Sequence, residues 1–396
     1  MGKARYLNDD IFFNVLSQLP TKILVGLKCV SKGWKSLISD RRFIQAQLRK
    51  TELTVSGFIF QEKFQWYEED IKTVSYIPVG KESFEVKQSV FDFLPEDIVV
   101  LASCDGLVCC RSCFPTEDPA IYICNPVNKE FVTLRCAGLD RDSSVALAFD
   151  PSQELVDTST NFKVVRAQQF EIEEGEEDLY FTFEIYSSKA GEWRKSNEIC
   201  KCNTSLSKNK GIYIGGILHW LTDGDNILTF DSEKELSWLI SVPVPASEFK
   251  SIPQACIGES DGRLHYVMIS EEGLHLWCLE DYFESKWALK YSKPLRTMEK
   301  EHPRLLCNLH ERVMSVYDTE TPWVNPLAFK DGLLLMIVSA KIYLYHFETS
   351  KMQVVCEAFK LGSSSIFFPT VLPYSMSLVP LLSTVDDSVA GNKLTN

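Results

Sequence analysis

The chain has 396 residues, of which 45% are apolar and 24% are charged, and these values exclude a disordered or fibrous class. At roughly 100–200 residues per domain, this length predicts two or three domains. The net charge of −13 is unevenly placed, because residues 1–50 hold ten Lys/Arg and three Asp/Glu, a balance of +7 that leaves −20 for the rest of the chain.

Two observations bear on where the protein works. The longest purely aliphatic run, Leu333–Val338, is far shorter than the roughly 20 residues that a membrane-spanning helix needs. The first ten residues, MGKARYLNDD, lack the apolar core of a secretory signal. Tyr6 also stands where a myristoylation motif has Ser or Thr. We therefore expect a protein of the cytoplasm or the nucleus that binds no membrane.

The 13 cysteines are odd in number and scattered through strand-like segments as small hydrophobic residues. Cys110 and Cys113 form a Cys-x-x-Cys pair, with Cys104 and Cys109 close by in the sequence. Neither a second such pair nor a neighbouring histidine completes a zinc set. We predict buried or surface thiols at these positions, with no metal and no other cofactor.

The first 50 residues show apolar residues at helical spacing. We expect short helices from Asp9 or Asp10 to about Leu19, from Pro20 to about Val30, and two more that are capped by Ser31 and Asp40. Such a small set of helices cannot bury enough apolar surface to be stable by itself. Its lysines are interleaved with apolar residues and form no basic run, which favours an acidic protein partner over nucleic acid.

From about Thr51 the pattern changes to short strands rich in Val, Ile, Phe, Tyr and Trp. One recurring part is a glycine turn before an apolar strand, as in SCDGLVCC, IGGILHWL, ESDGRLHYVMI and FKDGLLLMIV. The other is a hairpin, as in YICNPVNKEFVTL, FEIYSSKAGEWRK, LTFDSEKELSWLI, LWCLEDYFESKWAL and LYHFETSKMQVV. The hairpins begin about 45 to 70 residues apart, which is the period of a propeller blade with loops of variable length.

These five units and a degenerate first unit, LTVSGFIFQ to IKTVSYIPV, predict an all-β domain that forms a β-propeller of six blades, with seven blades as the alternative count. The strand-like residues 371–382 have no hairpin of their own, so we expect them to close the ring by completing the first blade. A two-sheet β-sandwich is the rival architecture, although the strand region is large for a single sandwich. Residues 384–396 are typical of a disordered tail.

The sequence shows no catalytic constellation. It has no phosphate-binding glycine loop, no nucleophile elbow and no His-Glu-x-x-His motif. The histidines are dispersed, and the acidic residues 171–178 (EIEEGEED) are typical of a solvated hairpin loop. Tryptophans recur in the repeat elements, as blade cores require, while a stacking site on a propeller face remains the alternative interpretation. We predict that the protein is not an enzyme.

Residues 6–48 resemble the F-box motif over its whole length. The matching features are Leu7 with Asp9 and Asp10, the helix end VLSQLP, the pair Leu24 and Leu27, the stretch CVSKGWKSLISD, and Phe43. The strand region is similar to the F-box-associated, kelch-related domain of a large plant F-box family, through SCDGLVCC, YICNPVNKE, ALAFDP, FEIYSSKAGEWR, GGILHWL and LTFDSEKE. Asn8 stands where the family usually has proline. Gly26 and Gly33 fall inside predicted helices, where each glycine destabilises the helix by up to about 1 kcal/mol relative to alanine.

The resemblance implies an F-box at residues 1–50 that binds a Skp-family adaptor and an F-box-associated domain at residues 51–383 that recognises a protein substrate. It implies a substrate-receptor subunit of an SCF-type ubiquitin ligase, which reaches cullin and RING subunits through the adaptor. The residues expected to contact the adaptor are Leu7, Ile11, Leu16, Leu19, Pro20, Leu24, Leu27, Val30, Trp34, Leu37 and Ile38. Basic residues would surround them and steer an acidic partner, namely Lys22, Lys28, Lys32, Lys35, Arg41 and Arg42.

Three alternatives stay open at this point. The head could dock only on the β-domain of the same chain. The protein could bind the adaptor without cullin, as a non-ligase F-box protein. The β-domain could instead be a module that binds a small molecule or a sugar. The sequence identifies no substrate-binding residue.

Overall fold

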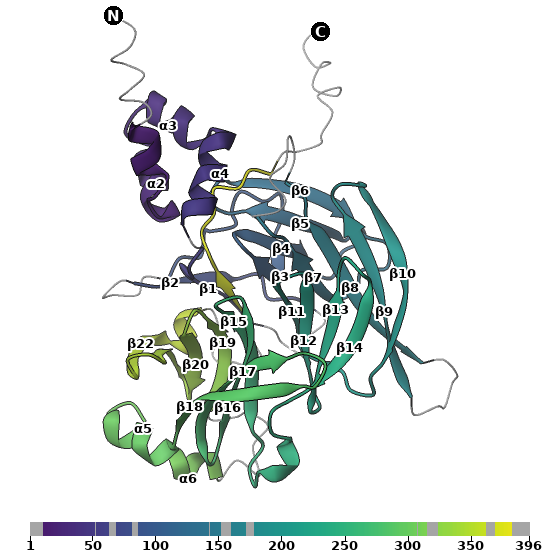
Figure 1. The fold of residues 1–396 in the computed structure, drawn as a ribbon, viewed down its shortest axis with the longest axis vertical. Coiled ribbons are helices and arrows are strands. Elements are labelled where there is room, and N and C mark those ends of the chain that lie inside the picture. Colours follow the sequence, from purple (N-terminus) through teal and green to yellow (C-terminus); the bar gives the residue numbers. More distant parts are fainter. Residues whose placement is uncertain are drawn as a thin grey trace, which may run out of the picture.

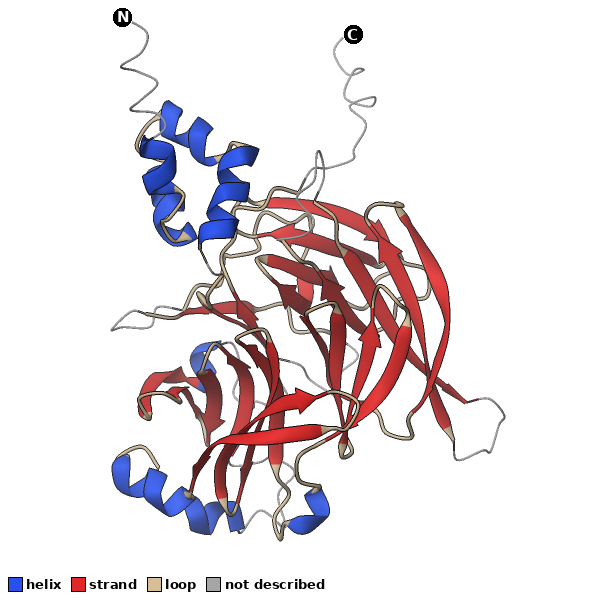
Figure 2. Cartoon of the chain, in the orientation of Figure 1, coloured by secondary structure: helices blue, strands red, loops and turns tan. Residues whose placement is uncertain are grey.

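A helical head lies against a ring of β-sheets in the computed structural model (Figures 1 and 2). The structure describes residues 11–51, 53–62, 69–80, 86–141, 143–151, 160–171, 178–306, 308–314, 324–361 and 369–381. Leu7, most of the acidic residues at 171–178 and the expected tail at 384–396 lie outside these ranges. Within them, no helix is both long enough and apolar enough to span a membrane.

The head consists of helical residues 11–16 followed by α2 (Thr21–Leu27), α3 (Lys32–Ile38) and α4 (Arg41–Lys50). The caps predicted at Ser31 and Asp40 are present, while Asp9 and Asp10 lie outside the described residues. The Ser31 hydroxyl accepts a hydrogen bond from the Trp34 N–H at 3.1 Å, and the Asp40 carboxylate accepts one from the Arg42 N–H at 2.8 Å. Helix α2 ends before the predicted residue Val30, because the Val30 N–H bonds to the Leu27 carbonyl in a tighter turn.

The strands form six antiparallel blades, which we number in chain order. Blade 1 contains β3 (Ile98–Cys104), β4 (Leu107–Ser112), β5 (Ala120–Asn125) and β6 (Glu130–Arg135). Blade 2 contains β7 (Ser144–Ala148), β8 (Lys163–Glu171), β9 (Leu179–Ser187) and β10 (Glu192–Lys201). Blade 3 contains β11 (Leu206–Ile214), β12 (Ile217–Thr222), β13 (Asn226–Asp231) and β14 (Leu236–Ser241).

The remaining blades complete the ring. Blade 4 contains β15 (Gln254–Ser260), β16 (Arg263–Ser270), β17 (Gly273–Asp281) and β18 (Lys286–Lys293). Blade 5 contains β19 (Val324–Lys330), β20 (Leu333–Val338), β21 (Lys341–His346) and β22 (Lys351–Glu357). Blade 6 combines β23 (Thr370–Tyr374) from the end of the chain with β1 (Gly57–Gln61) and β2 (Val74–Pro78). The antiparallel pairing of β23 with β1 confirms the predicted closure, and the fold is a propeller rather than a sandwich.

The first strands of the blades run in the same direction around the ring. Strand β7 pairs with β11 in parallel, and β15 pairs with β19 in parallel, so that these contacts join neighbouring blades. Because each blade is an antiparallel meander, its first and third strands end on the same face of the ring. The turns after first strands and the hairpins between third and fourth strands therefore share one face.

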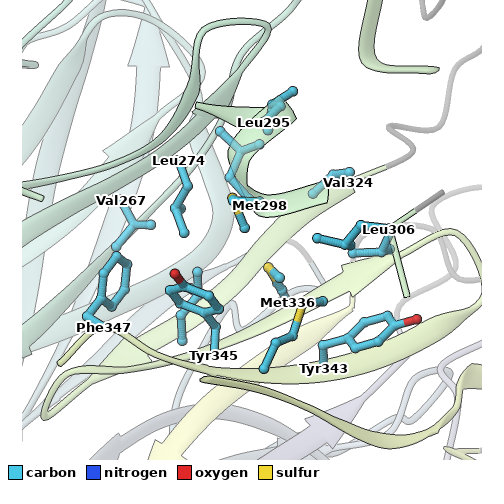
Figure 3. Packing of buried hydrophobic residues seen from close by; sticks show 14 of the residues in the cluster. Val267, Leu274, Leu295, Met298, Leu306, Val324, Met336, Tyr343, Tyr345 and Phe347 are labelled. Carbon is cyan, nitrogen blue, oxygen red and sulfur yellow. The ribbon is translucent and has the colours of Figure 1, made fainter. Parts of the chain in front are cut away.

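The sequence did not predict helices α5 (Leu295–Glu301) and α6 (Leu309–Met314), which lie between β18 and β19. Their apolar side chains Leu295, Met298 and Leu309 are buried against blades 4 and 5. Figure 3 shows Leu295, Met298 and Leu306 near Met336 and Tyr343 of blade 5. The helices thus extend the core between these two blades. Two short 3-10 turns, η1 (Ala246–Glu248) and η3 (Ala358–Leu361), complete the described elements.

Candidate functional site: the head and its attachment

Large apolar side chains are exposed on the head at an unusual density. Of the twelve that are exposed among the described residues, five belong to residues 11–30. These five side chains, which we call the head surface, are Ile11, Phe12, Val15, Ile23 and Val30. The Phe12 ring lies 6.3 Å from the partly buried Trp34 ring, centroid to centroid. Apolar side chains gathered on one small domain indicate a surface that another molecule covers.

The structure divides the predicted contact residues into groups. Ile11, Pro20 and Val30 are exposed. Leu19, Leu27, Trp34 and Leu37 are partly buried against the head core. Leu7 lies outside the described residues. Phe12, Val15 and Ile23 were absent from the predicted set, although the spacing of Ile11 and Val15 already indicated one helix face.

Leu16, Leu24 and Ile38, which the sequence placed among the adaptor contacts, are buried inside the chain. They pack with Phe43 and Ile44 in the core of the head. Leu378, from the end of the chain, completes that core. An amphipathic pattern marks these side chains as apolar, but it does not tell whether the chain itself or another protein covers them.

The head is strongly basic. Residues 11–50 hold eight Lys/Arg and a single acidic residue, Asp40, which caps α4. Lys22, Lys32 and Arg42 are exposed. Lys28 is partly buried, and burial lowers its pKa, while the nearby carboxylate of Glu130 on the propeller acts in the opposite direction. The exposed apolar side chains thus lie on a domain whose charge attracts an acidic partner.

The head is attached to the propeller by residues 375–381, which follow β23 and which we call the strap. In Figure 1 the strap is yellow and runs beside α4 toward the start of β6. Leu378 of the strap is fully buried in the head core, and Val379 and Leu381 are buried in the core of blades 1 and 2. Val127, in the hairpin between β5 and β6, also packs against the head core. The strap therefore contributes to both domains at once.

Two asparagines of the β5–β6 hairpin hold the strap in place. The side-chain amide of Asn125 donates to the carbonyl oxygens of Ser377, at 3.0 Å, and Val379, at 2.7 Å. The side-chain amide of Asn128 donates to the carbonyl oxygens of Leu378 and Val379. The Glu130 carboxylate accepts a hydrogen bond from the Leu381 N–H at 2.7 Å. This is the NPVNKE sequence of the predicted hairpin, so its polar residues serve to bind the end of the chain.

Gly106, in the β3–β4 turn, accommodates the strap by having no side chain. Its φ of +95° already favours glycine, and a Cβ added there would lie 2.1 Å from the Cβ of Ser377. The Ser56 hydroxyl accepts a hydrogen bond from the Met376 N–H at 3.0 Å, which fixes the strap on blade 6. The glycine turn of SCDGLVCC is thus also a docking surface for the strap.

Charged side chains gather where the first strands of blades 1, 4 and 5 end. Lys330 pairs with Glu259 across neighbouring blades at 2.8 Å. Burial raises the pKa of Asp105 to about 6; the Lys330 charge opposes this, whereas the carboxylates of Glu259 and Asp331 add to it. Asp105, Glu259 and Lys330 border a cavity at the centre of the ring, which is also lined by Lys210, Tyr213 and Phe329. We infer no reaction for this mixed set of charges.

The cysteine cluster that the sequence singled out lies in blade 1. Cys104, Cys109 and Cys110 are buried, and burial raises the pKa of each thiol. Burial also raises the pKa of Cys113 to about 12, with the Asp70 carboxylate adding to the shift. These thiols are therefore neutral at physiological pH. In the part of the chain that the structure describes, no three His, Cys, Asp or Glu side chains gather in a way that suits a metal ion.

Comparisons with known proteins agree with both halves of this architecture. Residues 6–45 match the F-box domain, and residues 75–324 match the family described as "F-box protein At3g26010-like, beta-propeller". The chain is 27% identical to F-box protein At5g49610 of Arabidopsis thaliana over 328 residues, which cover 78% of this chain and 86% of that protein. It is 26% identical to F-box protein At5g07610 of the same plant over 323 residues, which cover 75% and 73%.

Among solved structures, TolB from Acinetobacter baumannii aligns with a TM-score of 0.39 and 10% identity over 83% of this chain and 69% of that one. A TM-score of this size does not establish a shared fold. The family match, by contrast, spans more than half of the chain and coincides with the blades described above. The chain therefore belongs to the F-box proteins of the At3g26010-like β-propeller family, with an F-box head and a β-propeller body.

Proposed function

We propose that the protein is the substrate-receptor subunit of an SCF-type ubiquitin ligase. The F-box head binds a Skp-family adaptor and, through it, cullin and RING subunits, while the propeller holds a protein target. The subunit performs no chemistry itself. It raises the effective concentration of target lysines near the ubiquitin-loaded enzyme, which is catalysis by proximity. We place this work in the cytoplasm, the nucleus or both.

The head surface is the observation that carries this proposal. Val30 is 64% exposed and Val15 is 55% exposed, on a domain with a family match to the F-box. Covering a side chain of this kind is worth roughly 1.5–3 kcal/mol, so several of them support a stable complex. The lysines around them favour an adaptor with an acidic face. Leu16, Leu24 and Ile38 support the same surface from inside, because they hold the helices in place.

The test is co-expression of the full chain with a plant Skp adaptor, followed by size-exclusion chromatography. The wild type is expected to elute as a one-to-one complex. Val30→Asp and Phe12→Asp are expected to weaken adaptor capture at least tenfold, because a carboxylate would be buried in an apolar contact. Ile252→Asp is the matched control, because Ile252 is 70% exposed on the propeller. Unchanged capture by both head variants would overturn the proposal.

A second arm of the experiment separates a ligase subunit from an F-box protein that binds only the adaptor. Purified cullin with its RING subunit is added to the preformed complex, and the mixture is passed over the same column. Co-elution of cullin is expected. An adaptor complex that takes up no cullin would remove the ligase assignment while leaving adaptor binding in place.

A further inference from the structure

The hairpins between third and fourth strands have the same conformation in all five four-stranded blades. Each closes a four-residue loop, between the pairs Asn125 and Glu130, Ser187 and Glu192, Asp231 and Leu236, Asp281 and Lys286, and His346 and Lys351. The fourth loop residue has a positive φ in every case, at Lys129, Gly191, Glu235, Ser285 and Ser350. Equivalent loop positions can therefore be compared directly.

The second loop residue, which we call the tip residue, follows a simple rule in four of the five hairpins. In blades 2, 3 and 5 the tip residues Lys189, Glu233 and Glu348 are charged and exposed to solvent. In blade 1 the tip residue is Val127, which is apolar and packs against the core of the head. The tip residue is thus apolar in the hairpin that the head covers, and it is charged in the three hairpins whose tips face solvent.

Blade 4 departs from this rule. Its tip residue is Phe283, which is apolar and yet 89% exposed. Phe283 thus shares the apolar character of Val127, but no comparable cover lies over it among the described residues. Phe283 lies on the same face of the ring as Val127, since both hairpins follow third strands. Blade 4 is also directly across the ring of six from blade 1, so a molecule bound at Phe283 does not compete with the head.

The Phe283 side chain is held in position rather than free to turn away. The Asp281 carboxylate accepts hydrogen bonds from the N–H groups of Phe283, at 2.8 Å, and Glu284, at 2.9 Å. The Phe283 ring stacks on Trp238 of blade 3, with centroids 5.9 Å apart and an interplanar angle of 25°. Leu236, 53% exposed, lies two residues from Trp238 on the same side of β14. An exposed, ordered aromatic platform of this kind is typical of a binding hot spot.

Further contacts hold Trp238 and the two blades in place beside Phe283. Trp238 meets Tyr282 edge to face at 6.3 Å, and Trp287 of blade 4 donates its indole N–H to the Ser241 carbonyl of blade 3 at 2.8 Å. The two blades are therefore tied together under Phe283. Covering Trp238 does not explain Phe283 by itself, because this contact leaves nearly all of the Phe283 side chain in water.

The negative charge around Phe283 favours a partner segment that carries basic residues. Four turns of blades 3 and 4 open on this face, and three of them, at residues 231–236, 259–263 and 281–286, hold charged side chains. Most of these charges are paired, since Glu233, Glu235 and Glu259 form ion pairs with Lys163, Arg194 and Lys330. The charges of these turns that form no ion pair among the described residues are three acidic and one basic, namely Asp261, Asp281, Glu284 and Arg263. The propeller region as a whole is acidic as well. A segment with Lys or Arg beside its apolar anchor is attracted to such a face, and its cation can also lie over an aromatic ring.

We propose that the hairpin tips of blades 3 and 4, with Phe283, Trp238 and Leu236 at the centre, bind a linear protein segment that carries an aromatic or branched aliphatic residue flanked by Lys or Arg. This proposal deepens the proposed function. It rests on that function only in assigning the bound segment to the ligase target. The binding surface itself depends only on the propeller.

The experiment uses the full chain and fluorescent synthetic peptides, and it measures the dissociation constant by fluorescence polarisation at low and high salt. One peptide series has Phe, Leu or Ser at its centre with Lys and Arg on both sides, and a matched series has Glu and Asp there. The basic Phe and Leu peptides are expected to bind, and to bind more weakly at high salt. The Ser peptide and the acidic peptides are expected to bind at least tenfold more weakly.

Phe283→Ala and Phe283→Lys are expected to weaken binding of the basic Phe peptide at least tenfold. Ile252→Ala is the control, because Ile252 is also apolar and 70% exposed but lies outside these three turns. Thermal melting shows that each variant folds, which is expected because Phe283 is at an exposed hairpin tip. The proposal is overturned if the basic peptides do not bind, if the acidic series binds as well, or if the Phe283 variants bind like the wild type.

Two further measurements separate the remaining explanations. If sedimentation shows a dimer that Phe283→Ala dissolves, then the occupant is a second copy of this chain and the peptide proposal is wrong. Val30→Asp is expected to lose the adaptor while keeping the peptide, and Phe283→Ala is expected to do the reverse. A chain that binds the peptide but never the adaptor would refute the ligase function and leave the binding surface intact.

Discussion

The side-chain amide of Asn128 donates hydrogen bonds to the carbonyl oxygens of Leu378, at 3.1 Å, and Val379, at 3.0 Å. These residues are about 250 positions apart in the chain, yet this contact presents Leu378 to the core of the head. The orientation of the F-box relative to the propeller therefore depends on the far end of the sequence. Under the proposed function, this attachment would set the position of the bound target relative to the adaptor.

Leu378→Ala is expected to loosen the head without unfolding the propeller. Removing a buried leucine side chain costs about 2–5 kcal/mol, and here the loss falls on the contact between α2, α4 and the strap. Hydrogen exchange of the α2 and α4 amides is the measurement, with faster exchange expected there and little change in blades 3 to 5. Leu289→Ala is the control, because Leu289 is 54% exposed on β18. Uniformly faster exchange throughout the chain would contradict a local role.

Asn125 offers a sharper test, because it is fully buried and its amide serves two carbonyl groups. Asn125→Ala leaves both carbonyl oxygens without these donors, at a cost of about 1–3 kcal/mol in the free energy of unfolding. Asn125→Asp has the same shape, keeps an acceptor for the Val127 N–H, and places a carboxylate oxygen against the carbonyl oxygens. We expect Asp to be more damaging than Ala in urea denaturation. Equal stability of both variants and the wild type would show that the clamp contributes nothing.

The sequence predicted most of the fold, because short strands and glycine turns are local signals. The NPVNKE hairpin was predicted correctly as a turn, but the purpose of Asn125 and Asn128 depends on a segment 250 residues away, which no local pattern reveals. Helices α5 and α6 were missed because each is short and packs on a strand core. The burial of Ile38 within the chain was not predicted, because helical spacing alone does not assign Leu378 to the core of the head. Phe283 becomes informative only when the five hairpins are compared in three dimensions.

Asp105 makes the stability of the propeller depend on pH in an unusual direction. Burial raises the pKa of its carboxyl to about 6, above its value of about 3.9 in an unfolded chain. The folded state therefore keeps a proton that the unfolded state releases between about pH 4 and pH 6. The stabilising contribution of this proton is fully present below about pH 4 and is lost as the pH rises through about 6.

Asp105→Asn is accordingly expected to stabilise the protein at neutral pH, by about 3 kcal/mol at most, and to have little effect near pH 4. Asparagine also adopts the left-handed backbone of this turn, where φ is 43°. The free energy of unfolding, measured in urea across this pH range, checks the prediction. Asp261→Asn is the matched control at the equivalent, exposed turn of blade 4, where φ is 52°. A gain that does not vary with pH would contradict the assigned cause.

Two glycines are expected to respond in opposite ways to the same substitution. Gly26 lies within α2, and a Cβ added there would meet no atom within 4 Å, so Gly26→Ala is expected to stabilise the head by up to about 1 kcal/mol. Gly106 has a φ of +95°, and its added Cβ would lie 2.1 Å from the Cβ of Ser377, so Gly106→Ala is expected to displace the strap. Hydrogen exchange of α4 should slow in the first variant and quicken in the second. Unchanged α4 exchange in Gly106→Ala would mean that the strap does not hold the head, because displacing it would then have no effect on α4.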